Sequence, residues 1–391
     1  TDIRFVDFRF SADQTYAVEF GNLKCRFWTK DGQVESSGSP YELVSPYAEA
    51  DLRNLMWEQS GNVLYMASTS TSVPPQKLTR SGHTSWAFSN VDFKDGPYLP
   101  INDTANEVTT SGPPSTGGTT TLTFTSTAFI NNGTGFVSTD VGRQIRCQFE
   151  GAWSWGVIAS VVDTDEVTVT WSDGQGGSLS GSATSKSWRL GMFSATTGYP
   201  RAVAIYQGRV LWAGTPSNPR AYAYSYSGLP DTFSPSEVDG TVTDAHGGAG
   251  DITAGDEILW LMEAPRLQIG TPSAVRSLGA NDISQVFGPR NIYQKLEVRE
   301  GVSSVRPVAI GPSTVHCGAY STTIHDLYFD YEVNSVVNPE LSITSEHLVS
   351  PGVKELCFQQ LPHRRLFAIV DGDLVATTVN RYEKIIGWTS Q

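Results

Sequence analysis

The chain has 391 residues, of which only 17% are charged, and it is rich in glycine and aromatic residues, with 37 Gly, 10 Trp, 15 Tyr and 17 Phe. This composition is typical of many short strands joined by tight turns, and it excludes a predominantly helical protein. The net charge of −13 excludes a protein that wraps nucleic acid with a basic face, because phosphate contacts need clustered Lys and Arg.

Neither a membrane segment nor a cofactor site is predicted. No stretch approaches the roughly 18 apolar residues that span a bilayer, and the first residues do not resemble a signal peptide, so we expect a soluble protein made in the cytoplasm. The four cysteines lie far apart, with no CxxC pair and no histidine at zinc spacing, so we expect buried free thiols without disulfides or metal. They are Cys25, Cys147, Cys317 and Cys357.

Six β-hairpins are predicted along the chain, each from an apolar run, a short turn and a second alternating run. Two of the turns, Gly21-Asn22 and Asp371-Gly372, are dipeptides that favour two-residue hairpins. In chain order the paired runs are residues 16–20 with 23–28, 62–66 with 77–80, 209–214 with 221–225, 257–262 with 267–271, 314–318 with 324–328, and 365–370 with 373–377.

The spacing of these hairpins predicts an all-β fold with a six-bladed, propeller-like domain. Successive hairpins begin about 46 to 57 residues apart, except that about 147 residues separate the second from the third. Removing residues 101–190 restores a spacing near 57, and four short strands per repeat are typical of propeller blades. A pair of β-sandwiches with incidental hairpins is the alternative that spacing alone leaves open.

Residues 101–190 are predicted to form an inserted small β-barrel domain, because loop tips tolerate insertions. The propeller then consists of residues 1–100 and 191–391. We interpret Thr109–Gly118, which is rich in Gly, Ser, Thr and Pro, as a linker that cannot pack. The strands predicted after it are 120–124, 144–149, 155–162 and 166–171.

Short segments in a fixed order carry a family resemblance along nearly the whole chain. They include Gln14–Gly21, Gln59–Tyr65, Asp95-Gly-Pro-Tyr98 and Gln207–Thr215. The other segments are 8–11, 26–28, 45–47, 75–80, 140–146, 155–158, 188–191, 198–201, 258–262, 269–271, 346–348, 359–362, 371–374 and 387–388. Together they resemble the nozzle or hub proteins of short-tailed phage (podovirus) tails, which include the tail tubular protein B group and the tail stabilisation proteins.

This resemblance implies a structural protein of the virion, located in the viral tail. It implies a homo-hexamer around the tail axis, below an adaptor (head-to-tail connector) protein and the portal, with tail fibre, spike or needle proteins as further partners. It also implies that double-stranded DNA passes through the tail tube during ejection without sequence-specific binding. The acidic net charge is compatible with such a channel, because a negative wall repels DNA and lets it slide.

No catalytic motif is recognisable, so we expect a protein that is not an enzyme. The chain has no GxxxxGK[ST], no GxGxxG that opens a helix after a strand, no HExxH and no GxSxG. Among the histidines only His316 and His325, on opposite arms of one hairpin, could meet. Catalytic, cofactor-binding and metal-binding residues are therefore all predicted to be absent.

The alternative function is a glycan-binding or glycan-cleaving propeller of a phage tail. Cleavage would need two carboxylates about 5 to 10 Å apart. We interpret the two candidate clusters as solvated carboxylates at turns or strand ends. The clusters are Asp163, Asp165 and Glu166, and Asp326, Asp330 and Glu332. A third possibility is a scaffold propeller that binds peptides.

Three further patterns have both a structural and a functional interpretation. Tyr222, Tyr224 and Tyr226 alternate along one strand, and we interpret them as blade core rather than a contact stripe. Arg364-Arg365 could contact an acidic partner or lie in a solvated turn. Asp244–Gly250 is interpreted as a flexible glycine-rich stretch that cannot cradle phosphate, because no helix follows it.

Overall fold

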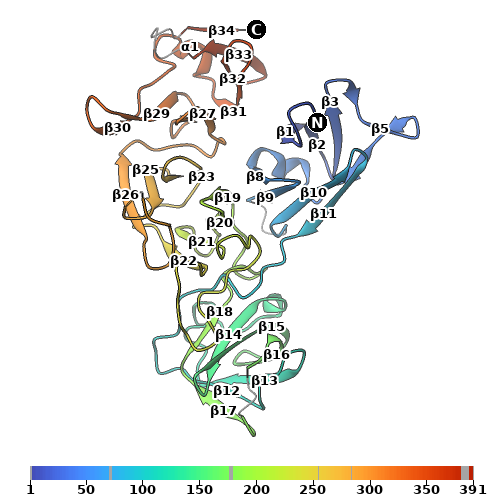
Figure 1. Cartoon of the computed structure of the whole chain (residues 1–391), viewed down its shortest axis with the longest axis vertical. Coiled ribbons are helices and arrows are strands. Elements are labelled where there is room, and N and C mark those ends of the chain that lie inside the picture. Colours follow the sequence, from blue (N-terminus) through green and yellow to red (C-terminus); the bar gives the residue numbers. More distant parts are fainter. Residues whose placement is uncertain are drawn as a thin grey trace.

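The protein is a six-bladed β-propeller with a seven-stranded, nearly closed barrel-like sheet inserted between the second and third blades (Figure 1). The computed structural model describes residues 2–69, 73–175, 179–253, 255–282, 284–379 and 387–390. The predicted fold class is therefore confirmed. In Figure 1 the inserted sheet lies at the bottom, and both ends of the chain lie near the top.

The first three blades are formed as follows. The first blade contains β1 (Arg4–Arg9), β2 (Thr15–Gly21), β3 (Lys24–Thr29), β4 (Gly32–Gln33) and β7 (Glu42–Val44). The second contains β8 (Met56–Ser60), β9 (Val63–Ala67), β10 (Gln76–Gly82) and β11 (Ser85–Asn90). The third contains β19 (Ala202–Tyr206), β20 (Arg209–Ala213), β21 (Ala221–Tyr224) and β22 (Gly248–Asp251).

The last three blades follow without interruption. The fourth contains β23 (Trp260–Met262), β24 (Leu267–Gly270), β25 (Val275–Gly279) and β26 (Tyr293–Val298). The fifth contains β27 (Val308–Ile310), β28 (Ser313–Cys317), β29 (Ile324–Asp330) and β30 (Ser335–Val337). The sixth contains β31 (Val353–Gln359), β32 (Arg365–Val370), β33 (Asp373–Thr378) and β34 (Trp388–Ser390).

Helices are few and short in the described part of the chain. They are the 3-10 helices η1 (Glu49–Asn54), η2 (Asn131–Gly133) and η3 (Ser138–Asp140) and the α-helix α1 (Glu346–Val349), and a small hairpin pairs β5 (Glu35–Ser36) with β6 (Ser39–Pro40). Within the described residues, no helix has the length and apolar character needed to cross a membrane.

Each predicted hairpin lies in a different blade, which confirms the repeat. In five blades the hairpin forms the second and third strands, as β2 and β3 do in the first blade. The fourth hairpin is displaced by one position, because it pairs β23 with β24, the first two strands of its sheet. The strand there begins at Trp260 rather than at Glu257, so the predicted run was too long at its start.

The inserted sheet has the strand order β17-β12-β13-β16-β15-β14-β18. Its two edge strands, β17 (Ala183–Ser185) and β18 (Trp188–Leu190), are separated by two residues, so the sheet curls until its edges nearly meet. The remaining strands are β12 (Val108–Thr110), β13 (Thr119–Phe124), β14 (Gln144–Phe149), β15 (Ala152–Asp163) and β16 (Glu166–Asp173). The strands agree with the predicted barrel, while the domain boundaries at 101 and 190 stay a prediction.

The prediction of a linker at Thr109–Gly118 was wrong. Val108–Thr110 forms β12, which pairs with β13 on one side and β17 on the other. The residues that follow also pack, since the Gly117 amide donates to the Trp171 carbonyl at 2.8 Å. Threonine has a high strand propensity, and here the sheet supplies the partner that the segment needs in order to pack.

The glycine-rich stretch was also interpreted incorrectly, because Gly248–Asp251 forms β22, the outer strand of the third blade. The rings of Tyr222 and Tyr224 on β21 lie against this strand. A Cβ at Gly248 would overlap the Tyr224 hydroxyl, and one at Gly250 would lie 2.9 Å from the Tyr222 hydroxyl. The glycines therefore make room for the tyrosines, which is a packing role rather than flexibility.

The first strands of the blades surround the propeller axis. β8 packs against β19, β19 against β23, and β27 against β31. Among the described strands, each blade is built from one continuous stretch of the chain. No described strand from one end of the chain completes a blade at the other end, so the described contacts that join the first blade to the sixth come from side chains.

Arg4 forms this connection. It is buried, and its Nη1 donates to the carbonyls of Leu52, Arg53 and Leu55 at 2.8, 3.0 and 2.9 Å. Its Nε lies 3.5 Å from Glu355 Oε1 on β31, while Arg53 Nη1 lies 3.4 Å from Glu355 Oε2. Burial lowers the pKa of Arg4 to about 10, so the guanidinium remains protonated at neutral pH.

Trp57 on β8 extends this contact to two more blades. Two guanidiniums lie over its indole ring, with Arg4 at 4.8 Å and Arg306 at 4.2 Å from the ring centroid. The indole nitrogen donates to Asp7 at 3.2 Å, and Arg306, just before the fifth blade, donates to the Trp57 carbonyl at 3.2 Å. We call Arg4, Arg53, Trp57, Arg306 and Glu355 the closure cluster.

Replacing Glu355→Gln should destabilise the propeller by about 2 to 4 kcal/mol, because it leaves the buried Arg4 charge without its carboxylate. Urea unfolding followed by tryptophan fluorescence measures this change. The control is Glu42→Gln, which removes an ion pair with Arg26 at the protein surface and should change stability little. Equal effects of the two substitutions would contradict a closing role for Glu355.

Candidate functional site

Polar side chains of the inserted sheet attach it firmly to the propeller. Gln144 on β14 accepts from the Gly96 amide at 2.5 Å and donates to the Phe93 carbonyl. Main-chain hydrogen bonds reinforce this contact, from Leu99 to Leu190 at 2.9 Å and from Trp153 to Val238 at 2.8 Å. The insertion is therefore bonded to the connecting segment before it and to a loop of the third blade.

Two arginines, the buried Arg146 and the half-buried Arg189, lie at the centre of this junction. The Arg146 guanidinium is 3.4 Å from the Asp95 carboxylate and donates to the Ser236 carbonyl at 2.9 Å. Arg146 and Arg189 both lie over the Trp153 ring, at 5.1 and 5.0 Å from its centroid. Burial, and then the charge of Arg146, lower the pKa of Arg189 to about 10. The aromatic face stabilises the cation that Asp95 does not pair with.

Arg146→Ala should loosen the junction, because the buried Asp95 carboxylate would lose its cationic partner and keep the Tyr98 hydroxyl as a hydrogen-bond donor. We expect about tenfold faster amide hydrogen exchange in residues 93–99 and 236–240, measured by mass spectrometry. Lys186→Ala is the control, since Lys186 makes an exposed ion pair with Glu107 in the same sheet. Unchanged exchange in the Arg146 variant would show that the main-chain bonds alone hold the insertion.

The predicted contact between His316 and His325 is confirmed. The two residues are partners in the β28–β29 register, and their rings stack at 5.5 Å. His316 Nε2 lies 2.9 Å from Asn338 Oδ1, and His325 Nε2 lies 2.9 Å from Thr323 Oγ1. No group of three or more His, Cys, Asp or Glu in the described part of the chain could hold a metal ion. The pair is therefore a packed, hydrogen-bonded part of the fifth blade.

Burial lowers the pKa of His316, so folding favours its neutral form. In the unfolded chain the imidazole binds a proton with a pKa of about 6.5, so stability should fall as the pH drops below that value. The fall should continue until the pH reaches the lowered pKa of the folded state. Above about pH 7.5 the group is neutral in both states and should contribute no pH dependence.

Thermal unfolding of His316→Gln between pH 7.5 and pH 5 should show a smaller loss of stability than the wild type shows. His347→Gln provides the control, because it replaces a histidine that is exposed and lies outside the buried pair. A wild-type profile that stays flat over this range would contradict the role assigned to His316.

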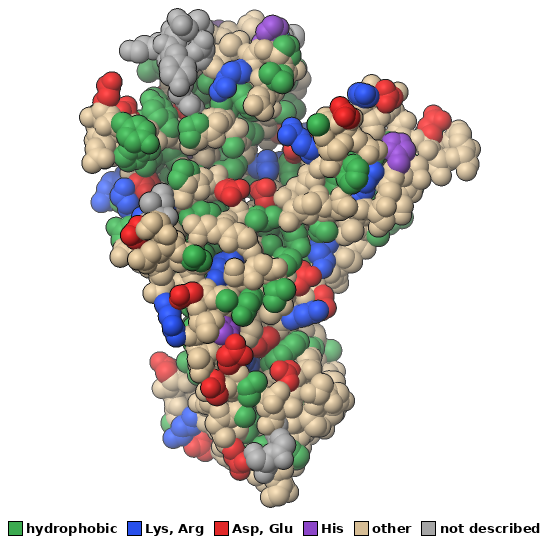
Figure 2. Space-filling view, in the orientation of Figure 1, with side chains coloured by type: hydrophobic (Ala, Val, Ile, Leu, Met, Phe, Trp, Pro, Cys, Tyr) green, Lys and Arg blue, Asp and Glu red, His purple; other side chains and the backbone are tan. Residues whose placement is uncertain are grey.

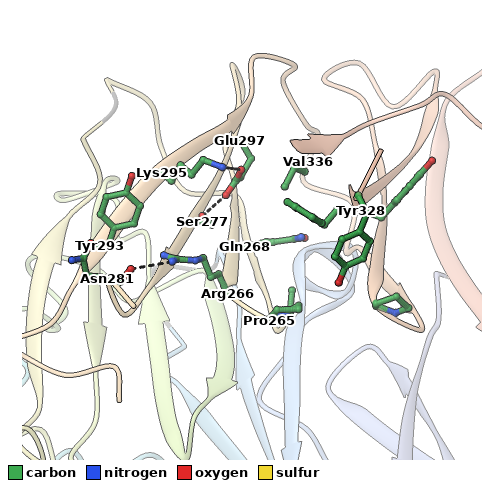
Figure 3. Close-up of a pocket in the computed structure, with 14 residues that line it drawn as sticks. Pro265, Arg266, Gln268, Ser277, Asn281, Tyr293, Lys295, Glu297, Tyr328 and Val336 are labelled. Carbon is green, nitrogen blue, oxygen red and sulfur yellow. Dashed lines mark hydrogen bonds and ion pairs between the residues drawn. The ribbon is translucent and has the colours of Figure 1, made fainter. Parts of the chain in front are cut away.

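A cavity of about 650 Å³ lies between the fourth and fifth blades (Figure 3). Its two walls come from segments that are distant in sequence and carry different chemistry. The fourth blade contributes the polar wall, with Arg266, Gln268, Ser277, Asn281, Tyr293, Lys295 and Glu297. The fifth blade contributes the more apolar wall, with Pro312, Tyr328, Phe329, Tyr331 and Val336. We call this cavity the interblade pocket.

The charged groups of the polar wall are unequally paired. Glu297 is engaged, because Lys295 Nζ lies 2.8 Å away and Ser277 Oγ donates to it at 2.7 Å. Arg266 donates to the Asn281 carbonyl at 3.3 Å and lies 5.3 Å from the Tyr293 ring centroid. Within the described residues Arg266 forms no direct ion pair, and the exposed Asp282 is its longer-range electrostatic partner.

The two carboxylate clusters considered in the sequence lie at the β15–β16 turn and along β29 with the turn that follows it. Asp163 and Glu166 are partners across the β15–β16 turn at the tip of the inserted sheet. Asp326 is buried, which makes the prediction of a solvated carboxylate wrong there, and it lies four residues from Asp330 on β29. Four residues along a strand span about 13 Å, which is more than glycosidases use. Neither cluster lines the interblade pocket.

The tyrosine and cysteine predictions are largely confirmed. Tyr222 and Tyr224 are buried and pack against side chains of the fourth blade, so they are blade core. Tyr226 is half-buried and meets the His246 ring at 5.3 Å. The four cysteines are free thiols, but Cys357 is exposed rather than buried. Arg364 lies in an exposed turn.

Sequence reasoning missed the closure cluster, the junction and the interblade pocket, because each combines residues that are far apart in the chain. The only local signal for the pocket is the group of exposed aromatic residues near the end of β29. Phe329 and Tyr331 pack edge to face at 5.0 Å, and both remain exposed. Large exposed rings next to a cavity are a recognisable mark of a binding surface.

No protein-family model matches the chain, and no curated protein matches it in sequence. Solved structures that resemble it include BBS1N, determined in complex with ARL6DN, at 11% identity over 96% of this chain and 92% of that chain, with a TM-score of 0.38. Hsv2 of Kluyveromyces lactis matches at 8% identity over 100% and 98%, with a TM-score of 0.35. The Dos1 propeller matches at 10% identity over 93% and 75%, with a TM-score of 0.36. At these scores the fold assignment comes from the sheet topology alone.

Proposed function

We propose that this protein is a structural component of a phage tail, a nozzle or hub subunit that carries out no covalent chemistry. The observation that carries this proposal is the attachment of the insertion to the propeller. One buried ion pair, the cation–π contact of Arg189 with Tyr98 and main-chain hydrogen bonds join the two parts into one stiff body. A stiff body with a propeller at one end and a small barrel at the other suits a building block of an assembly that transmits force.

In this proposal six copies surround the tail axis in the virion and form part of the channel for double-stranded DNA. They join the adaptor protein to the fibre, spike or needle proteins of the distal tail. The ordered sequence segments that resemble nozzle proteins support this arrangement. The net charge of −13 supports it as well, because an acidic wall limits DNA adhesion during ejection.

Electron microscopy of the purified protein, alone and with the adaptor of the same phage, tests the proposal. The expected result is a six-fold ring with an axial hole at least about 20 Å wide, enough for a DNA duplex. A particle that stays monomeric under both conditions would overturn the proposal.

The channel role makes a second prediction that concerns binding of DNA. The assembled protein should not retain double-stranded DNA in a gel-shift experiment, even at about 50 mM salt, where phosphate contacts are strongest. Retention that falls steeply with added salt would reveal a basic DNA-binding face and contradict an acidic channel. A basic variant of the same ring, with exposed Glu residues changed to Lys, provides a positive control for the assay.

A further inference from the structure

We propose that the interblade pocket binds one pyranose unit of an oligosaccharide. The inference goes beyond the structural role and does not depend on it, because the pocket lies within a single chain between the fourth and fifth blades. Its volume of about 650 Å³ falls in the range of small-molecule sites, which bury a compact ligand.

Aromatic rings on both walls provide the apolar contacts. On the fifth blade, Tyr331 is 89% exposed and Phe329 45% exposed, while Tyr293 on the opposite wall is 40% exposed. Figure 2 shows hydrophobic side chains gathered over the β29–β30 region, with basic side chains beside them over β26. The C–H face of a pyranose is apolar and flat, so it can cover such a ring and remove it from water.

Polar groups between the rings match the hydroxyls of a sugar. Arg266 Nη1 is a donor and Gln268 Oε1 is an acceptor, and neither has a hydrogen-bond partner within the described residues. Both side chains line the cavity, while these two atoms are themselves buried. A hydroxyl both donates and accepts, so neighbouring hydroxyls of one sugar ring satisfy an unpaired donor and an unpaired acceptor together.

The charges on the wall argue against a phosphate ligand. Lys295 is already paired with Glu297, which leaves Arg266 as the one cation lining the pocket that forms no direct ion pair with a described carboxylate. A phosphate group is normally held by several cationic or amide donors. The many exposed aromatic atoms also favour a ligand with an apolar face over a compact anion.

The same wall favours binding over cleavage. Glu297 is the one carboxylate among the residues that line the pocket, and Lys295 and Ser277 engage it. Hydrolysis of a glycosidic bond by the common mechanisms needs two carboxylates placed on either side of the bond. The pocket therefore retains a saccharide without breaking it.

Saturation-transfer-difference NMR and calorimetry on the full chain test the proposal, with maltohexaose, cellohexaose, chitohexaose and tetragalacturonate as probes. We expect at least one probe to bind, with an affinity that falls about tenfold or more in Tyr331→Ala and in Gln268→Ala. The matched control is Tyr320→Ala. Tyr320 lies in the same blade, is 88% exposed and does not line the pocket, so this variant should bind as the wild type does.

The inference is overturned if no probe binds at concentrations up to about 10 mM. It is also overturned if binding survives both pocket substitutions, or if it falls as much in Tyr320→Ala as in Tyr331→Ala. Tyr331 is exposed in a turn, so its loss should leave the melting temperature unchanged, which thermal unfolding verifies. Sugar binding and ring formation are separate measurements, so failure of one leaves the other result standing.

Discussion

The ring depends on a buried arginine that meets a carboxylate from the far end of the chain. Among the described strands, each blade is built from one continuous stretch of the chain, so backbone pairing holds each blade together but does not join the first blade to the last. Arg4 provides that connection, with three main-chain carbonyls around its Nη1 and Glu355 beside its Nε. Trp57 lies against the same guanidinium, so the contact that closes the ring also orders the side chains at its axis.

The inserted sheet shows the same use of arginine in a second place. Arg146 and Arg189 lie over one indole ring, and the Asp95 carboxylate pairs with Arg146. In both places a guanidinium is removed from water and compensated partly by an aromatic face. Such contacts are directional, which makes them suited to fixing the angle between two bodies that hydrophobic packing alone would leave free.

Most of the architecture could be predicted from the sequence, but few of the sites could. Six hairpins at a steady spacing predicted six blades, because a blade is a local unit whose strands follow one another. The strand Gly248–Asp251 was not predicted, because glycines have no side chains that could show the alternation typical of a strand. The glycines are needed because the rings of Tyr222 and Tyr224 on β21 occupy the space that their side chains would fill. The interblade pocket and the closure cluster could not be predicted from the sequence, because their residues come together only after folding. Arg4, read alone, is an ordinary charged residue near the start of the chain.

Because the blades share no strands, the ring can accept inserted segments at the connections between blades. A segment added at a connection between blades leaves every backbone hydrogen bond of the ring in place, since no ladder crosses that connection. The insertion between β11 and β19 lies at one of these connections, and the blades on either side of it still pack through β8 and β19. The connections between blades can therefore take up a complete new domain without a change in strand pairing. An addition within a blade would instead change the pairing of the strands on either side of it.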